Sequence, residues 1–130
     1  MNFNETEQFS VDVTGDNSGQ KYYGTFDCLK RLTHGRQIAR DRLIREILGP
    51  NPQDASTRAR NQAEIVAQIQ ICLVSAPDWL KNARFGLELI DDNVIAEISD
   101  RIDEIQVKAI KEIREAGNKA KVVLEEKTSA

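Results

Sequence analysis

Histidine, cysteine and aromatic residues are scarce in this chain. The sequence contains one histidine, two cysteines and one tryptophan, and its aromatic residues make up only 5%. Cys28 and Cys72 show no CxxC spacing, and together with His34 they are too few for a dedicated zinc site. Because cytosolic thiols stay reduced, we expect a cytoplasmic protein with two free, partly buried cysteines and no bound metal.

Long apolar stretches are also absent. No segment approaches the roughly 20 apolar residues that cross a bilayer, and the mean hydropathy is −0.48. The N-terminal segment, MNFNETEQ, lacks the basic and apolar regions of a signal peptide. With a length of 130 residues, these absences predict one soluble domain with no membrane partner.

No motif in the sequence is specific for catalysis or nucleotide binding. Walker A, HExxH and dinucleotide-binding glycine patterns are missing. Asp91 and Asp92 could form a carboxylate pair, but two acids directly before a long helix are typical of helix capping and of charge that complements the helix dipole. His34 follows Cys28 at a strand-to-helix junction, which favours a surface histidine and a core thiol over a nucleophile and its base. We therefore predict that the protein is not an enzyme and has no catalytic residues and no cofactor.

Two segments near the N-terminus predict β-strands. Apolar and polar residues alternate over residues 8–13, and residues 21–29 are rich in aromatic residues and threonine. The glycine-containing turn at 15–19 predicts that they form a hairpin. Gly24 in the second strand indicates a bulge or a close backbone approach. Because an isolated hairpin is marginal in water, it must pack on helices or join a sheet in another subunit.

Helical segments follow the hairpin. Thr33 is a suitable N-cap for a helix over residues 34–48, which Gly49 would end. A second helix, predicted over 55–75, becomes apolar on most sides in its second half, so we expect it at the centre of the core. The segment Pro77–Trp79 is then expected to be a structural joint.

The last predicted helix, from Asp91 to about Glu126, is the longest. Its apolar residues recur at helical spacing in a narrow stripe: Ile98, Ile102, Ile105, Ala109, Ile113, Ala116, Ala120 and Val123. Such a helix is about 50 Å long, whereas a domain of this size is only about 30 Å across. The C-terminal part must therefore bend back, project, or pack on another chain, and Gly117 is the expected place for a break.

Together these elements predict a mainly α (α+β) fold, in which an N-terminal β-hairpin packs on a small helical domain with a long C-terminal helix. We divide this single domain into an N-terminal arm and hairpin (1–33), a helical core (34–90) and the long helix with its tail (91–130).

Charge is distributed unevenly along the chain. Residues 21–60 carry nine basic and four acidic residues, whereas residues 88–130 carry seven basic and eleven acidic residues. The two halves either pair with each other or present oppositely charged faces to different partners. Arg36, Arg40 and Arg45 are candidate phosphate contacts. Because acidic residues interrupt them and the sequence pI is about 5.2, nucleic acid is the least favoured kind of partner.

The order of several short motifs resembles that of small morphogenesis proteins of tailed bacteriophages, in particular tail assembly chaperones. The motifs are a strand ending in Gly15, then Tyr23-Gly24-Thr25-Phe26, Ile47-Leu48-Gly49, Ala76-Pro77-Asp78-Trp79, Gly86-Leu87-Glu88-Leu89 and Asp92-Asn93-Val94-Ile95. The resemblance covers residues 9–98 and leaves out most of the last helix. Leu80 stands where the family pattern often has a second tryptophan.

This resemblance implies a non-enzymatic protein that holds or recruits another virion protein, such as the tape-measure protein or the tube subunit, in the host cytoplasm. The alternative is a capsid-stabilising, connector or tail component that stays in the virion, bound to neighbouring subunits or to copies of itself. Nucleic-acid binding through the first helix is the third class. The candidate partner-binding residues are Tyr23, Phe26, Trp79, Ile102, Ile105, Ala109 and Ile113. For Trp79, a role in the core is the competing interpretation.

Overall fold

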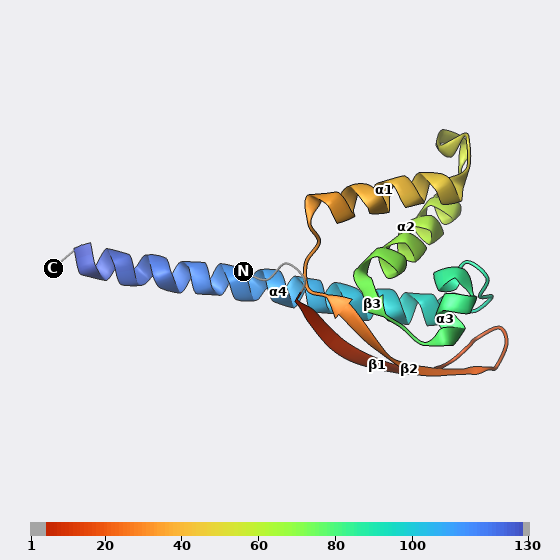
Figure 1. Ribbon diagram of the computed structural model, residues 1–130, viewed down its shortest axis with the longest axis horizontal. Coiled ribbons are helices and arrows are strands. Elements are labelled where there is room, and N and C mark those ends of the chain that lie inside the picture. The colour runs from red at the N-terminus through yellow and green to blue at the C-terminus, as the bar shows by residue number, and fades with distance from the viewer. Residues whose placement is uncertain (1–4, 129–130) are drawn as a thin grey trace.

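The computed structural model describes the backbone of residues 5–128 and the side chains of residues 5–119. The elements are β1 (Thr6–Thr14), β2 (Lys21–Leu29), α1 (His34–Leu48), η1 (Pro52–Asp54), α2 (Thr57–Cys72), β3 (Leu73–Ser75), α3 (Asp78–Asn82), η2 (Arg84–Gly86) and α4 (Asp92–Thr128). The α+β class, the N-terminal hairpin and the long C-terminal helix are as the sequence predicts (Figure 1).

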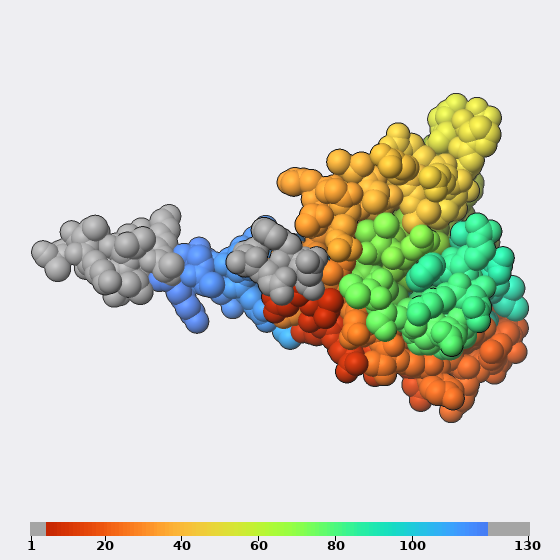
Figure 2. All heavy atoms as spheres, in the orientation of Figure 1, coloured from red at the N-terminus to blue at the C-terminus, as the bar shows by residue number. Residues whose placement is uncertain are grey.

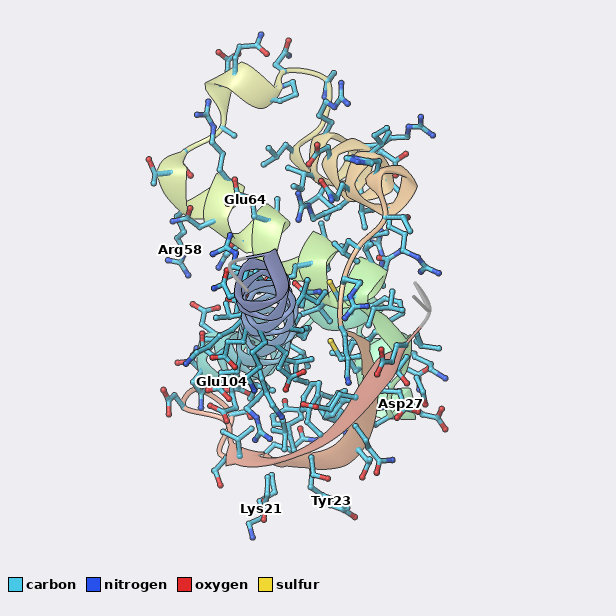
Figure 3. The ribbon with its side chains drawn as sticks, turned by 90° about the vertical axis from the view of Figure 1, so that its left-hand side faces the viewer. Lys21, Tyr23, Asp27, Arg58, Glu64 and Glu104 are labelled. Atoms are coloured by element: carbon cyan, nitrogen blue, oxygen red, sulfur yellow. The ribbon has the colours of Figure 1, made fainter. Side chains whose placement is uncertain are left out.

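Helix α4 is the axis of the fold. It contacts α2 on one side and strands β1 and β2 on the other, and Figure 3, which looks nearly along its axis, shows it between these two layers. Ile98 and Ile102 of α4, Ile69 of α2 and Phe26 of β2 have no exposed area, and they belong to one apolar cluster. The rings of Phe9 and Phe26 stack within it, with their centroids 4.9 Å apart.

Residues 73–75 form a strand, so the prediction that the second helix reaches Ser75 is wrong. Helix α2 ends at Cys72, and Leu73 pairs with Cys28 while Ser75 pairs with Asp27. The resulting sheet has the order β1-β2-β3, in which all neighbours are antiparallel. A short apolar run does not distinguish the end of a helix from a buried strand. The hairpin thus gains its third strand from the same chain.

Helix α1 forms an outer layer that packs on α2. It begins as predicted, with the Thr33 hydroxyl accepting a hydrogen bond from the Arg36 amide, but none of its residues is buried and Ile38 is 56% exposed. The central position expected for the second helix is confirmed, because α2 contributes Val66 and Ile69 to the buried interior.

The hairpin turn is fastened to the start of α4 by Asp91. This side chain has no exposed area, and its carboxylate accepts hydrogen bonds from the Asn17 amide (2.7 Å), the Ser18 amide (2.9 Å), the Ser18 hydroxyl (2.6 Å) and the Tyr22 hydroxyl (3.1 Å). These bonds, those from Ser18 first, lower the pKa of Asp91. Asp91 directly precedes α4, where its charge was expected, and its backbone oxygen accepts a hydrogen bond from the Val94 amide. Its carboxylate in addition holds the hairpin turn, which the sequence did not show, while Asp92 supplies the acidic charge in the first turn of α4.

A glycine at position 24 lets the joint after β3 approach the sheet. A Cβ atom placed on Gly24 would overlap Cγ of Pro77. Of the two interpretations of this glycine, a bulge and a close approach, the structure shows the close approach, because β1 and β2 pair without a register shift at this position.

We expect Gly24→Ala to lower the free energy of unfolding by about 1–3 kcal/mol, the usual cost of overpacking. Gly35→Ala is the matched control, since the nearest atom to its Cβ would be Thr33 Oγ1 at 3.9 Å. Urea unfolding of both variants measures the difference. Equal stability of the two variants would contradict a tight contact between Gly24 and Pro77.

Candidate docking surface

Four of the seven residues predicted to bind a partner are buried in the chain's own core. Their exposed fractions are 0% for Phe26, 0% for Ile102, 6% for Ile105 and 2% for Ala109. A docking role for these four is corrected to a packing role, because a partner cannot reach side chains that this fold already covers. The apolar stripe on α4 is therefore part of the packed core as far as Ala109.

Trp79 is half-buried and connects α3 to the hairpin. Its ring lies against those of Tyr22 and Phe26, with centroid distances of 5.1 and 6.2 Å. Its indole Nε1 donates a hydrogen bond of 2.9 Å to the backbone oxygen of Tyr23. These contacts give Trp79 a packing role. Tyr23 itself is 72% exposed, and Figure 3 shows its side chain pointing away from the rest of the molecule on the outer face of the hairpin.

Ile113 is the one member of the predicted set on α4 that is exposed. It lies four residues after Ala109, the last buried residue of α4 among the described side chains, and all residues from 110 to 119 are exposed. Figure 1 shows α4 continuing beyond the sheet and the other helices. The backbone stays helical at Gly117, so the expected break does not occur. Ala120 and Val123, the last members of the stripe, lie outside the described side chains.

Three large apolar side chains stand in solvent where α4 leaves the core. Val107 is 64% exposed, Ile110 is 49% exposed and Ile113 is 42% exposed. We call these three residues the late apolar face. Sequence reasoning identified Ile113, but it missed Val107 and Ile110 because they lie outside the main stripe. Their spacing of three residues, which puts neighbours on one side of a helix, was the available signal.

Two shallow hollows meet at Ile110. One lies between α4, the start of α1 and the segment joining β2 to α1, and it is lined by Lys30, Arg31, Leu32, Gln37, Arg40, Gln106 and Ile110. The other lies along α4 and is lined by Val107, Ile110, Lys111 and Arg114. Five of these residues are basic and none is acidic, in a chain with a net charge of −3. The surface beside the late apolar face is therefore locally basic.

Three of the five cations form no direct ion pair with a described acidic residue, although Lys30 and, more weakly, the nearby Arg31 both lower the pKa of the Glu5 carboxyl group. Lys30 Nζ lies 2.9 Å from a Glu5 carboxylate oxygen, and Arg40 Nε lies 3.7 Å from one of Asp41. The ion pairs among described side chains do not include Arg31, Lys111 or Arg114. Nε of Arg31 is moreover buried, and no described atom accepts a hydrogen bond from it. That atom is enclosed by the fold, so a docking partner could contact Arg31 only through its terminal nitrogen atoms.

The three candidate phosphate contacts do not share one face of α1. Arg36 and Arg40 are one turn apart, whereas Arg45 lies five residues further on, about 140° around the helix from Arg40. Arg36 and Arg40 are partly covered and Arg45 is exposed. Of the three, only Arg40 lines the hollow that contains Lys30 and Arg31. This distribution does not form a continuous track of cations along the helix.

A second groove runs between α1 and the segment α3–η2, over α2 (Figure 2). Its apolar lining includes Leu43, Ile47 and Phe85. Arg84 and Phe85 have φ values of 52° and 57°, in the left-handed region that side chains seldom adopt. Two acidic and two basic residues line this groove, so it shows no preference for the charge of a ligand. We therefore place the candidate docking surface on α4.

No protein-family model, curated protein or solved structure matches this chain. Within residues 5–128, no helix combines the length and apolar composition needed to cross a membrane. The described side chains include no cluster of three or more histidine, cysteine, aspartate or glutamate residues that could hold a metal ion.

Both thiols are enclosed in the core and are not joined to each other. Burial raises the pKa of Cys28 to about 12 and also raises the pKa of Cys72. We expect neither thiol to react with a maleimide at neutral pH while the protein is folded, because the reactive thiolate is scarce and inaccessible. Mass spectrometry should show two labels after denaturation. Rapid labelling of the native protein would show that the core opens locally.

Proposed function

We propose that this chain is a non-enzymatic assembly protein, of the kind represented by the tail assembly chaperones of bacteriophages, and that it acts by binding another protein through the late apolar face. The observation that carries this proposal is the change in α4 at Ala109. One side of α4 is buried against the sheet and α2 up to this residue; beyond it Ile110 and Ile113 are exposed, and Val107 is exposed one turn before Ile110. An amphipathic helix with an uncovered face is a common docking element.

The resemblance of residues 9–98 to phage morphogenesis proteins supplies the class of partner. The partner would then be another virion protein, such as a tape-measure protein or a tube subunit, and the chain would hold or recruit it during assembly. The late apolar face lies outside the segment that carries the resemblance. The part of the fold that resembles the family would thus hold in place a binding surface that the resemblance does not include.

A virion component is the second candidate function. The outer face of the hairpin favours it, because Tyr23 is 72% exposed and would suit a lasting contact with a neighbouring subunit. Light scattering separates the two functions. A monomer before assembly supports a chaperone, whereas a stable oligomer supports a component that remains in the particle.

Co-expression with the proteins encoded beside this chain tests the proposal. The tagged chain should retain a phage structural protein, identified by mass spectrometry after purification. Ile113→Asp should abolish this co-purification, because a charge would enter the apolar contact. Ile38→Asp is the matched control, since Ile38 is 56% exposed on α1 and lines neither of the hollows that meet at Ile110. Retention of no virion protein, or equal retention by both variants, would contradict the proposal.

A further inference from the structure

The two hollows at Ile110 combine apolar side chains with five basic ones, three of which form no ion pair with the described residues. Leu32, Val107 and Ile110 supply the apolar part. Around them lie Lys30, Arg31, Arg40, Lys111 and Arg114, with no acidic residue in either lining. A surface of this composition binds best to a segment that has apolar side chains on one face and carboxylates along its flanks.

We propose that this surface, which we call the basic hollow, binds an acidic amphipathic helix of the partner protein. The inference rests on the proposed function and specifies the partner's binding segment. Apolar side chains of the segment would contact Leu32, Val107 and Ile110. Its aspartate and glutamate residues would lie beside Arg31, Lys111 and Arg114, the three cations that form no ion pair with the described residues.

Arg31 is one of the cations that a carboxylate of the partner would contact. The Nε atom of this residue is buried without a hydrogen-bond partner among the described residues. Because Nε is enclosed by the fold, a carboxylate could bind this guanidinium group only through its two terminal nitrogen atoms, which also permit a bidentate pair. The fixed positive charge of Arg31 favours an acid over a neutral polar side chain at this place.

The alternative ligand of a basic surface is nucleic acid, and the observations favour protein. Phosphate-binding surfaces on proteins present rows of cations, often with aromatic side chains on which bases stack. Here the cations surround an aliphatic floor, and neither hollow contains an aromatic residue. Leu32, Val107 and Ile110 offer a nucleic acid little, whereas they suit leucine or isoleucine side chains of a helix.

Fluorescence anisotropy with designed peptides tests the inference on the full-length protein. The probe is a labelled amphipathic helix with leucine on one face and glutamate on the other, and the comparison peptide has lysine in place of glutamate. We expect the acidic peptide to bind at least about tenfold more tightly, and its binding to weaken as salt is added. Equal binding of the two peptides would overturn the inference. So would tighter binding of a single-stranded or duplex oligonucleotide.

Variants locate the site and separate this inference from the proposed function. Arg31→Gln and Ile110→Asp should each weaken acidic-peptide binding at least about fivefold, whereas Arg45→Gln, on the far side of α1, should leave it unchanged. If the acidic peptide fails to bind but a virion protein still co-purifies through Ile113, the inference fails and the function stands. If the peptide binds at Ile110 but no virion protein is retained, the proposed function fails and the basic hollow stands.

Discussion

Replacing Asp91 by alanine should destabilise this protein more than replacing any other buried polar residue by alanine. The variant would leave the amides of Asn17 and Ser18 and the hydroxyl of Tyr22 without their shared acceptor. Because unsatisfied groups in a closed site are costly, we expect the melting temperature to fall by more than about 10 °C. The hairpin turn should detach from α4 first, which hydrogen exchange at residues 15–20 would report.

Asp92→Ala is the matched control for this prediction. Asp92 is the neighbouring acid, but its side chain is exposed and its ion pair is a 3.3 Å contact with the exposed Arg58. Exposed pairs of this kind contribute little, so the control should keep nearly the wild-type melting temperature. Similar losses in both variants would show that the carboxylate at 91 has no special role.

The pKa of Asp91 also predicts how stability depends on pH. The hydrogen bonds from Ser18, Asn17 and Tyr22 lower this pKa below its ordinary value of 3.8. The ionised carboxylate therefore stabilises the folded state above that ordinary value, and its contribution is lost as pH falls through the lowered pKa. Urea unfolding at a series of pH values should show a smaller acid-induced loss of stability in Asp91→Asn than in the wild type. If the free energy of unfolding falls equally in the two proteins as the pH is lowered, the carboxylate of Asp91 is not linked to stability in this way.

Trp79→Ala should lower the free energy of unfolding by about 3 kcal/mol, near the lower end of the range for tryptophan truncation because the ring is only half-buried. The loss removes ring contacts with Tyr22 and Phe26 and the hydrogen bond to the Tyr23 oxygen. Trp79→Phe keeps part of the packing and loses the hydrogen bond, so it should cost about half as much. A Trp79→Ala variant that unfolds like the wild type but loses its partner would instead make Trp79 a binding residue.

The parts of the fold that follow local rules could be predicted from the sequence. Strand alternation and a glycine-containing turn predicted the hairpin, and the Thr33 cap with the Gly49 stop predicted α1 at its observed bounds. Each of these signals depends on a few neighbouring residues. The central place of α2 also followed from local composition, because a helix that is apolar on most sides has to be enclosed.

The parts that depend on distant contacts could not be predicted. Leu73 becomes strand because Cys28 offers a sheet edge 45 positions earlier in the chain, and no local pattern shows that edge. The stripe on α4 has the same spacing before and after Ala109. The sequence therefore shows which face is apolar, but only the positions of the sheet and α2 decide that Ile105 is buried and Ile113 is free. This is why four core residues were predicted to bind a partner.

Docking through the late apolar face requires α4 to project beyond the core, and small-angle X-ray scattering with light scattering on the purified chain tests this most directly. A helix of 37 residues is about 55 Å long. We predict a monomer with a radius of gyration clearly above the value of about 14 Å expected for a compact domain of 130 residues. A monomer with a radius of gyration near 14 Å would contradict the account, because α4 would then fold back and cover Ile110 and Ile113. A stable oligomer would contradict the chaperone function and favour a component that remains in the particle.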